Sequence, residues 1–146
     1  MKSGGQPAIV YVDGGSRGNP GDAAFGVVVR NREGATLAEF GDYIGKATNN
    51  QAEYRGLLAA LEWARRRGVQ DLLVRADSEL VVRQMTGRYR VKSTALQPLF
   101  HEARRLAAGF ERFRIEHVRR DDNADADRLA NLAMDLRGPV EGVAQP

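Results

Sequence analysis

The period of the hydrophobic pattern changes near Thr48, and this change limits the folds open to the chain. Before Thr48, apolar runs at residues 8–12, 23–30 and 37–44 are rich in β-branched and aromatic side chains and are separated by stretches containing Gly, Pro and Asn. Such runs predict three strands of an antiparallel meander. After Thr48, apolar residues recur at the spacing of one helix face. A meander followed by a helix indicates a sheet that is covered by helices.

The rest of the chain alternates helices with short strands. Thr48 and Gln51 fit a capping box at the start of a helix that ends at Gly68. We then expect a strand at 72–77, a short helix from Ser78 to residue 87, a helix at 94–108, a strand at 113–118 and a final helix capped by Asn123. The order β-β-β-α-β-α-α-β-α predicts an α/β fold with a mixed sheet.

The length of 146 residues matches one domain of about 150 residues. We assign residues 1–137 to a single domain, and residues 138–146, which lack periodicity, to a disordered tail or a linker. No run approaches the roughly 20 apolar residues needed to cross a bilayer, and the first residues lack the apolar stretch of a signal peptide. We therefore expect a soluble, cytoplasmic protein with no membrane partner.

The side-chain inventory excludes several kinds of site. The chain has no cysteine, which rules out disulfides, zinc–cysteine sites, iron–sulfur clusters and thiol catalysis, and only two histidines remain for imidazole chemistry. Any metal ion must therefore bind mostly to oxygen. The net charge of +3 is too small to require a polyanionic partner, although basic residues are concentrated between positions 88 and 120.

Four acidic residues stand where several elements begin or end. Asp13 and Asp77 end apolar strand runs, Glu53 lies beside a helix stripe, and Asp127 follows Asn123 by one helical turn. Each alone is explained by a cap, a turn or a surface charge. Together they predict a carboxylate cluster, which needs cations to offset its repulsion. Oxygen ligands favour Mg²⁺ or Mn²⁺ over Zn²⁺, and a pair of such ions indicates phosphodiester hydrolysis.

Four motifs occur in a defined order: DGGSRGNPG from Asp13, TNNQAE from Thr48, ADS from Ala76 and NADADRLAN from Asn123. In this order they resemble ribonuclease H of type 1, over residues 9–134. The resemblance implies a five-stranded mixed sheet with helices on both faces. It also implies an endonuclease that cleaves the RNA strand of an RNA–DNA hybrid, leaving a 5′-phosphate and a 3′-hydroxyl, with two Mg²⁺ ions per site and Mn²⁺ as a substitute.

The resemblance also implies a role for each acidic residue. Asp13 would bridge the two ions, Asp127 would help to hold the ion that carries the attacking water, and Glu53 and Asp77 would complete the shell of the other ion. Asp125 is the alternative to Asp127. Asp127 fits better because the family pattern places the ligand four residues after the Asn, here Asn123, and directly before a Leu-Ala pair. In this sequence Arg128 stands between Asp127 and that pair.

Other positions match residues that contact the substrate in this family. Asn19, Asn49 and Asn50 match residues that face the RNA minor groove, where an amide can donate to or accept from a 2′-hydroxyl. Thr48 is similar to a threonine that grips a phosphate of the DNA strand, although helix capping also explains Thr48 and Asn49. Ser78 is included among the substrate-binding candidates.

The sequence departs from the family pattern at two places. Many members carry a loop histidine before the last helix, but the alternation around His117 places this residue on a strand, so we expect Arg119 or Arg120 to approach the scissile phosphate instead. Some bacterial members insert a Trp- and Lys-rich basic protrusion, of which only residues 88–93 remain here. Substrate grip should therefore be weaker or depend on other arginines.

Three other functions compete with this one. A non-catalytic nucleic-acid-binding domain of this fold would lack at least one of the metal ligands, but all four acidic residues are present. A different nuclease or an integrase of the same architecture would act on DNA or duplex RNA. A dinucleotide-binding enzyme would need a G-x-G-x-x-G element that opens a helix, which is missing. The partner that we expect is an RNA–DNA hybrid, with duplex RNA as an alternative, and the protein is expected to be a monomer.

Overall fold

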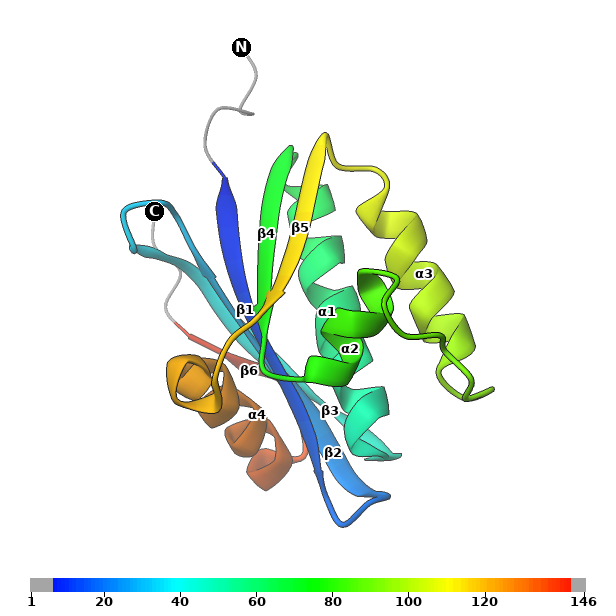
Figure 1. The fold of residues 1–146 in the computed structure, drawn as a ribbon. Helices are drawn as coiled ribbons and strands as arrows, with labels where there is room; N and C mark the ends of the chain where they lie inside the picture. The colour runs from blue at the N-terminus through cyan, green and yellow to red at the C-terminus, as the bar shows by residue number, and fades with distance from the viewer. Residues whose placement is uncertain (1–6, 143–146) are drawn as a thin grey trace.

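One mixed sheet organises residues 7–142, the part of the chain that the computed structural model describes (Figure 1). Its strand order is β5-β4-β1-β2-β3-β6. The strands are β1 (Ala8–Arg17), β2 (Gly21–Arg30), β3 (Thr36–Ala47), β4 (Asp71–Ala76), β5 (Arg112–His117) and β6 (Val140–Glu141). The helices are α1 (Asn49–Arg66), α2 (Glu79–Met85), α3 (Gln97–Ala107), the short 3₁₀ helix η2 (Arg120–Asn123) and α4 (Ala124–Leu136). The predicted α/β class is confirmed, and the predicted elements occur in the predicted order, with η2 and β6 in addition.

The sheet has six strands, so the expected number of five is wrong. The sixth strand, β6, lies in the segment that we expected to be a disordered tail or a linker, and it pairs antiparallel with β3 at Phe40 and Gly41. The backbone amide of Gly142 extends this pairing by donating to the carbonyl of Glu39 at 2.8 Å. A two-residue strand has no detectable period, which is why the sequence pattern did not predict it. Residues 143–146 of that segment lie outside the described residues.

Strand β1 is longer than its apolar run. It pairs antiparallel with β2 from Ile9 to Arg17 and so extends beyond the predicted run at 8–12 into the glycine-rich stretch. Its parallel pairing with β4 stops earlier, at Val12 and Ala76. Asp13 therefore lies in mid-strand with respect to β2, but directly beyond the end of the β4 ladder. The carboxyl ends of neighbouring parallel strands are where α/β sheets place their ligand sites.

Helix α1 begins with the predicted capping box. The amide of Gln51 donates to the Thr48 hydroxyl at 3.2 Å, and the amide of Thr48 donates to the Gln51 side-chain oxygen at 2.8 Å. The helix lies very close to β1 at Gly14, where an added Cβ would come within 2.4 Å of the Ala52 backbone. Only glycine permits this approach, which brings the first turns of α1 beside Asp13.

Helices cover both faces of the sheet, with α1, α2 and α3 on one side and α4 on the other (Figure 1). Successive β2 side chains alternate between the two sides. Val27 and Val29 join the larger core under α1, whereas Ala24 and Val28 pack with α4. Between them, Gly26 faces α4, and a Cβ there would come within 2.1 Å of the Ala126 carbonyl oxygen. Helix α4 is thereby seated directly on the sheet.

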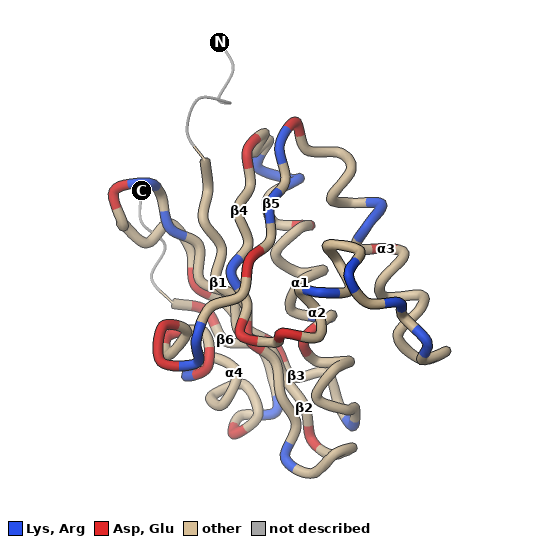
Figure 2. The backbone as a smooth tube through the Cα atoms, in the orientation of Figure 1, with Lys and Arg blue, Asp and Glu red and all other residues tan. Residues whose placement is uncertain are grey.

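The connection from α2 to α3 is irregular. Residues 86–96 contain turns but no helix, and α3 begins at Gln97, later than predicted, with a proline in its first turn. Figure 2 shows basic positions along this connection and along α3. Among residues 7–142, no helix is both long enough and apolar enough to span a membrane.

Candidate active site

Four acidic side chains from four segments line one cavity of about 410 Å³ at the end of the parallel strands. Asp13 comes from β1, Glu53 from α1, Asp77 follows β4, and Asp127 comes from α4. Figure 2 shows acidic positions along the turn between β4 and α2. The structure thus brings together all four carboxylates that the sequence analysis selected.

Three of these carboxylates have the geometry of a metal site. One oxygen each from Asp13, Glu53 and Asp77 lies within 4.8 Å of the other two. Asp127 lies beside Asp13 from the other face of the sheet, and its hydrogen bond and charge both affect the titration of Asp13. Oxygen-only donors of this kind suit a hard divalent cation such as Mg²⁺.

The electrostatics of Asp13 show how closely the carboxylates are packed. Burial is the largest cause of a rise in the pKa of Asp13 to about 8, followed by the charge of Asp77 and then by the hydrogen bond and charge of Asp127. At neutral pH the protein without a bound cation therefore keeps a proton on this group. A divalent cation would replace that proton, because it favours the ionised carboxylates.

Glu53 is buried, as Asp13 is. Burial, followed by the charges of Asp13 and Asp77, holds the pKa of Glu53 well above its usual range. The Gly14 backbone and the charge of Arg120 oppose this shift. Among the described residues, no group donates a hydrogen bond to its buried Oε1 atom. A buried carboxylate oxygen without a donor, facing two other carboxylates, fits the coordination of a cation.

Asp125, the alternative to Asp127, lies elsewhere. Its carboxylate is exposed and forms an ion pair with Arg30 at 2.6 Å. Asp125 and Arg30 line a separate, smaller hollow with Tyr11. Two residues along a helix point in different directions, which is why only one of the two aspartates faces the cluster.

The asparagine candidates form a connected group beside the cavity. Asn49 and Asn50 line the cavity, and Asn49 lies one turn before Glu53 on the same side of α1. The Asn49 side-chain oxygen accepts from the Ser16 amide at 2.8 Å, and the Asn19 side-chain oxygen accepts from the Asn49 amide at 3.0 Å. Asn19 itself does not line the cavity. These bonds leave the NH₂ groups of Asn19 and Asn49 to donate to a ligand.

The remaining candidates divide into two groups. Ser78 and Arg120 line the cavity, and Ser78 also caps α2 by accepting from the Val81 amide at 3.3 Å. Thr48, Arg119 and His117 do not line it. Thr48 forms the capping box described above. His117 is the last residue of β5, as its alternation predicts, and it is exposed.

Arg17 and Asn131 are among the cavity residues that the sequence analysis did not single out. Arg17 bonds the Asn131 carbonyl at 3.3 Å and forms an ion pair with Asp135 at 2.7 Å. The Asn131 amide group donates to the Asp127 carbonyl at 3.0 Å. Spacing is the sequence feature that could have identified both. Arg17 lies on the same side of β1 as Asp13, and Asn131 lies one helical turn after Asp127.

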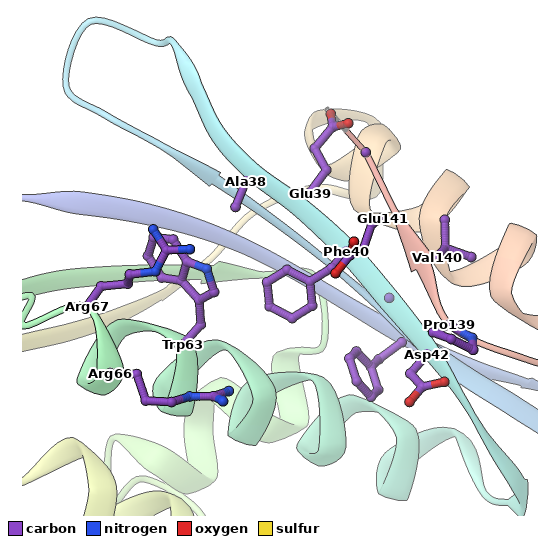
Figure 3. A pocket seen from close by; sticks show the side chains of 13 residues that line it. Ala38, Glu39, Phe40, Asp42, Trp63, Arg66, Arg67, Pro139, Val140 and Glu141 are labelled. Carbon is purple, nitrogen blue, oxygen red and sulfur yellow. The ribbon is translucent and has the colours of Figure 1, made fainter. Parts of the chain in front are cut away.

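A second hollow of similar volume, about 410 Å³, lies between β3, β6 and the end of α1 (Figure 3). Phe40 and Trp63 form its apolar wall, and Arg66 and Arg67 border it. Arg67 stacks over the Trp63 ring at 4.9 Å. None of the candidate residues from the sequence analysis lines this hollow.

Comparison with known proteins agrees with the geometry of the site. The family model described as reverse transcriptase-like matches residues 11–133. A ribonuclease HI of Halobacterium salinarum is 50% identical over 125 residues, covering 86% of this chain and 63% of that protein. A bifunctional protein of Mycobacterium tuberculosis is 51% identical over 128 residues, covering 87% of this chain. The chain spans only 35% of the length of this mycobacterial relative.

A solved structure supports the same relationship. The crystal structure of LC11-RNase H1 in complex with an RNA/DNA hybrid superposes with a TM-score of 0.84 at 42% identity. The match covers 88% of this chain and 97% of that one. The family-model match at residues 11–133 includes all four acidic residues of the cavity.

Proposed function

This chain belongs to the ribonuclease H family, and from that membership we propose that it is an endonuclease that hydrolyses the RNA strand of an RNA–DNA hybrid. The products are a 5′-phosphate and a 3′-hydroxyl. The observation that carries the proposal is the convergence of Asp13, Glu53, Asp77 and Asp127 on one cavity. A binding domain without activity has no use for a cluster that raises the pKa of its own carboxyl groups.

The acidic cluster would hold two Mg²⁺ ions, with Mn²⁺ as a substitute. Asp13 would supply a ligand to both ions, because its carboxylate lies with those of Glu53 and Asp77 and also interacts with Asp127. When bound, paired ions activate a water molecule and stabilise the attacking and leaving oxygens of an in-line displacement. The water oxygen would form a bond to phosphorus and release a proton to solvent. The bond from phosphorus to the 3′-oxygen would break, and that oxygen would take up a proton to become the 3′-hydroxyl.

Several neighbouring residues are proposed to bind the hybrid. The NH₂ groups of Asn19, Asn49 and Asn50 would donate to 2′-hydroxyl oxygens and to base edges in the minor groove, which is how RNA is distinguished from DNA. Ser78 and Arg120 line the same cavity and would contact the RNA backbone. Thr48 is proposed to bind a phosphate of the DNA strand in addition to capping α1.

The whole set of proposed ligands comes from one chain, so we propose that the protein acts as a monomer. Hybrids of RNA and DNA form inside cells, and we accordingly propose a cytoplasmic location. With no helix between residues 86 and 96, grip on the hybrid is proposed to depend on scattered arginines and to be correspondingly sensitive to salt.

Strand-specific cleavage provides the test of this function. The substrates are strand-labelled hybrid, duplex RNA and duplex DNA. With Mg²⁺ or Mn²⁺, we expect the protein to cut the RNA strand of the hybrid and to leave its DNA strand and duplex DNA intact. The physical reason is that amide donors beside the cavity have 2′-hydroxyl partners on only one strand of a hybrid. Gel analysis of the labelled products measures the result. Cleavage of duplex DNA at a rate similar to that of the hybrid would contradict the proposal, and efficient cleavage of duplex RNA would widen the substrate class.

Arg120 is expected to matter more than His117 for catalysis. Replacing Arg120 by Ala should lower kcat/KM by about 10- to 100-fold, the loss expected for one hydrogen bond to a charged phosphate. Arg120 lines the cavity and its charge reaches Glu53, whereas His117 is exposed on β5. Steady-state cleavage of a labelled hybrid measures both variants.

Arg119→Ala is the matched control for Arg120→Ala, because Arg119 is an exposed neighbour that does not line the cavity. It should affect activity less than the Arg120 change. A larger loss for His117→Ala than for Arg120→Ala would reject the assignment.

A further inference from the structure

Asn123 makes a buried contact that helix capping does not explain. It occupies the position before α4, but its side chain makes no capping bond, so that part of our sequence prediction is wrong. Its NH₂ group instead donates to the carbonyl of Val12 at 2.9 Å. The residue is only 1% exposed. The contact joins the last helix to the first strand, across 111 positions of sequence.

The location of this contact is informative. Val12 is the last β1 residue paired with β4, and it directly precedes Asp13. The Val118 amide donates to the carbonyl of Ala76, the partner of Val12, at 2.9 Å. The segment from Val118 to Asn123 is therefore hydrogen-bonded at both ends to the carboxyl ends of β1 and β4, where the acidic residues meet. Arg120 lies within this segment, and Asp127 follows it by one turn of α4.

We propose that Asn123 is a positioning residue that holds Arg120 and Asp127 in place relative to Asp13. This inference rests on the proposed function of the same cavity. Asn123 is not among the residues that line the cavity. It acts through the backbone, by fixing the start of α4 against the strand that carries Asp13. Small displacements of a carboxylate are enough to weaken a metal site, because coordination requires a specific geometry.

An unpaired atom argues against a purely stabilising role for Asn123. Its side-chain oxygen is buried, and among the described residues no group donates to it. A buried acceptor without a protein partner offsets part of the stability that the bond to Val12 contributes. The donor half of the amide is what the fold uses, and this half fixes the position of the helix.

The test replaces Asn123 by Leu, which keeps the branched shape and the number of side-chain heavy atoms, and by Ala, which shortens the side chain. Both changes remove the donor to Val12. Titration calorimetry of the full chain with Mg²⁺, without nucleic acid, should show an apparent dissociation constant that is about 10- to 100-fold higher than that of the unmodified protein, the range for losing an outer partner of a metal ligand. In hybrid cleavage, kcat should fall more than KM rises, and extra Mg²⁺ should restore part of the rate.

Tyr54→Phe is the matched control. It removes another buried hydrogen bond, from the Tyr54 hydroxyl to the Gln84 side-chain oxygen at 2.7 Å, between α1 and α2. We expect it to lower the Tm without changing the affinity for Mg²⁺. If both Asn123 variants bind Mg²⁺ as the unmodified protein does while losing stability like the control, Asn123 is only structural and the proposal is wrong. If Mg²⁺ affinity depends on Asn123 but the unmodified protein leaves the hybrid intact, the positioning role stands and the proposed function fails.

Discussion

Replacing Asp13 by Asn is expected to lower kcat for hybrid cleavage by at least about 10³-fold, more than loss of a single neutral donor at an active site costs. Asp13 lies at the centre of the cluster, because its oxygens meet those of Glu53 and Asp77 and its titration also depends on Asp127. Asn keeps the shape of the side chain but removes the charge that a pair of cations requires. Single-turnover cleavage of a labelled hybrid at saturating Mg²⁺ measures the effect.

Asp125→Asn is the control for this experiment. Asp125 is an exposed aspartate whose partner is Arg30, and it lies outside the cavity. Exposed ion pairs contribute little to stability, so this variant should fold and cleave like the unmodified protein. Cleavage by Asp13→Asn within about tenfold of the unmodified rate would remove the basis of the proposed mechanism.

Without divalent cations, the protein is expected to lose stability as the pH rises from about 4 to about 8. The folded state raises the pKa of Asp13 from 3.8 to about 8, chiefly through burial, so in this window it binds a proton that the unfolded chain has released. The contribution is therefore fully present below pH 3.8 and is lost as the pH rises through about 8. Each pH unit costs up to about 1.4 kcal/mol, which corresponds to a fall in Tm on the order of 10 °C between pH 5 and pH 8.

Thermal unfolding in a chelating buffer, followed by circular dichroism, measures this slope. Saturating Mg²⁺ should flatten it, because a cation bound to the folded state stabilises the ionised cluster. Asp13→Asn should also flatten it, although Glu53, whose pKa is raised as well, keeps part of the dependence. A Tm in chelator that stays level from pH 5 to pH 8 would contradict the assignment of a buried, protonated Asp13.

The sequence predicted those features whose signals are local. The capping box of Thr48 and Gln51 uses atoms three residues apart, and the apolar stripe of α4 at Ala126, Leu129 and Ala133 is buried as its period indicates. Asp13 and Asp77 could be placed together because both end apolar strand runs, and such ends meet at one edge of a parallel pair.

Features that depend on distant partners were missed. Strand β6 exists only because β3 offers an unpaired edge, and two residues carry no period of their own. Arg17 and Asn131 are 114 positions apart, so no local sequence pattern predicts their contact. The sequence predicts a cap at Asn123 because Asn is a favourable cap residue. In the structure, its side chain instead donates to the carbonyl of Val12 on β1.

The residues of the cavity come from both the first strand and the last helix, and this affects how the protein folds. Asp13 belongs to β1 and Asp127 to α4, so neither half of the chain contains the complete ligand set. Contacts between distant parts of a chain form late, because closing a long loop costs entropy before it is repaid. Cation capture should consequently be among the last events of folding, and a magnesium-dependent signal would report the arrival of the native state instead of the collapse that precedes it.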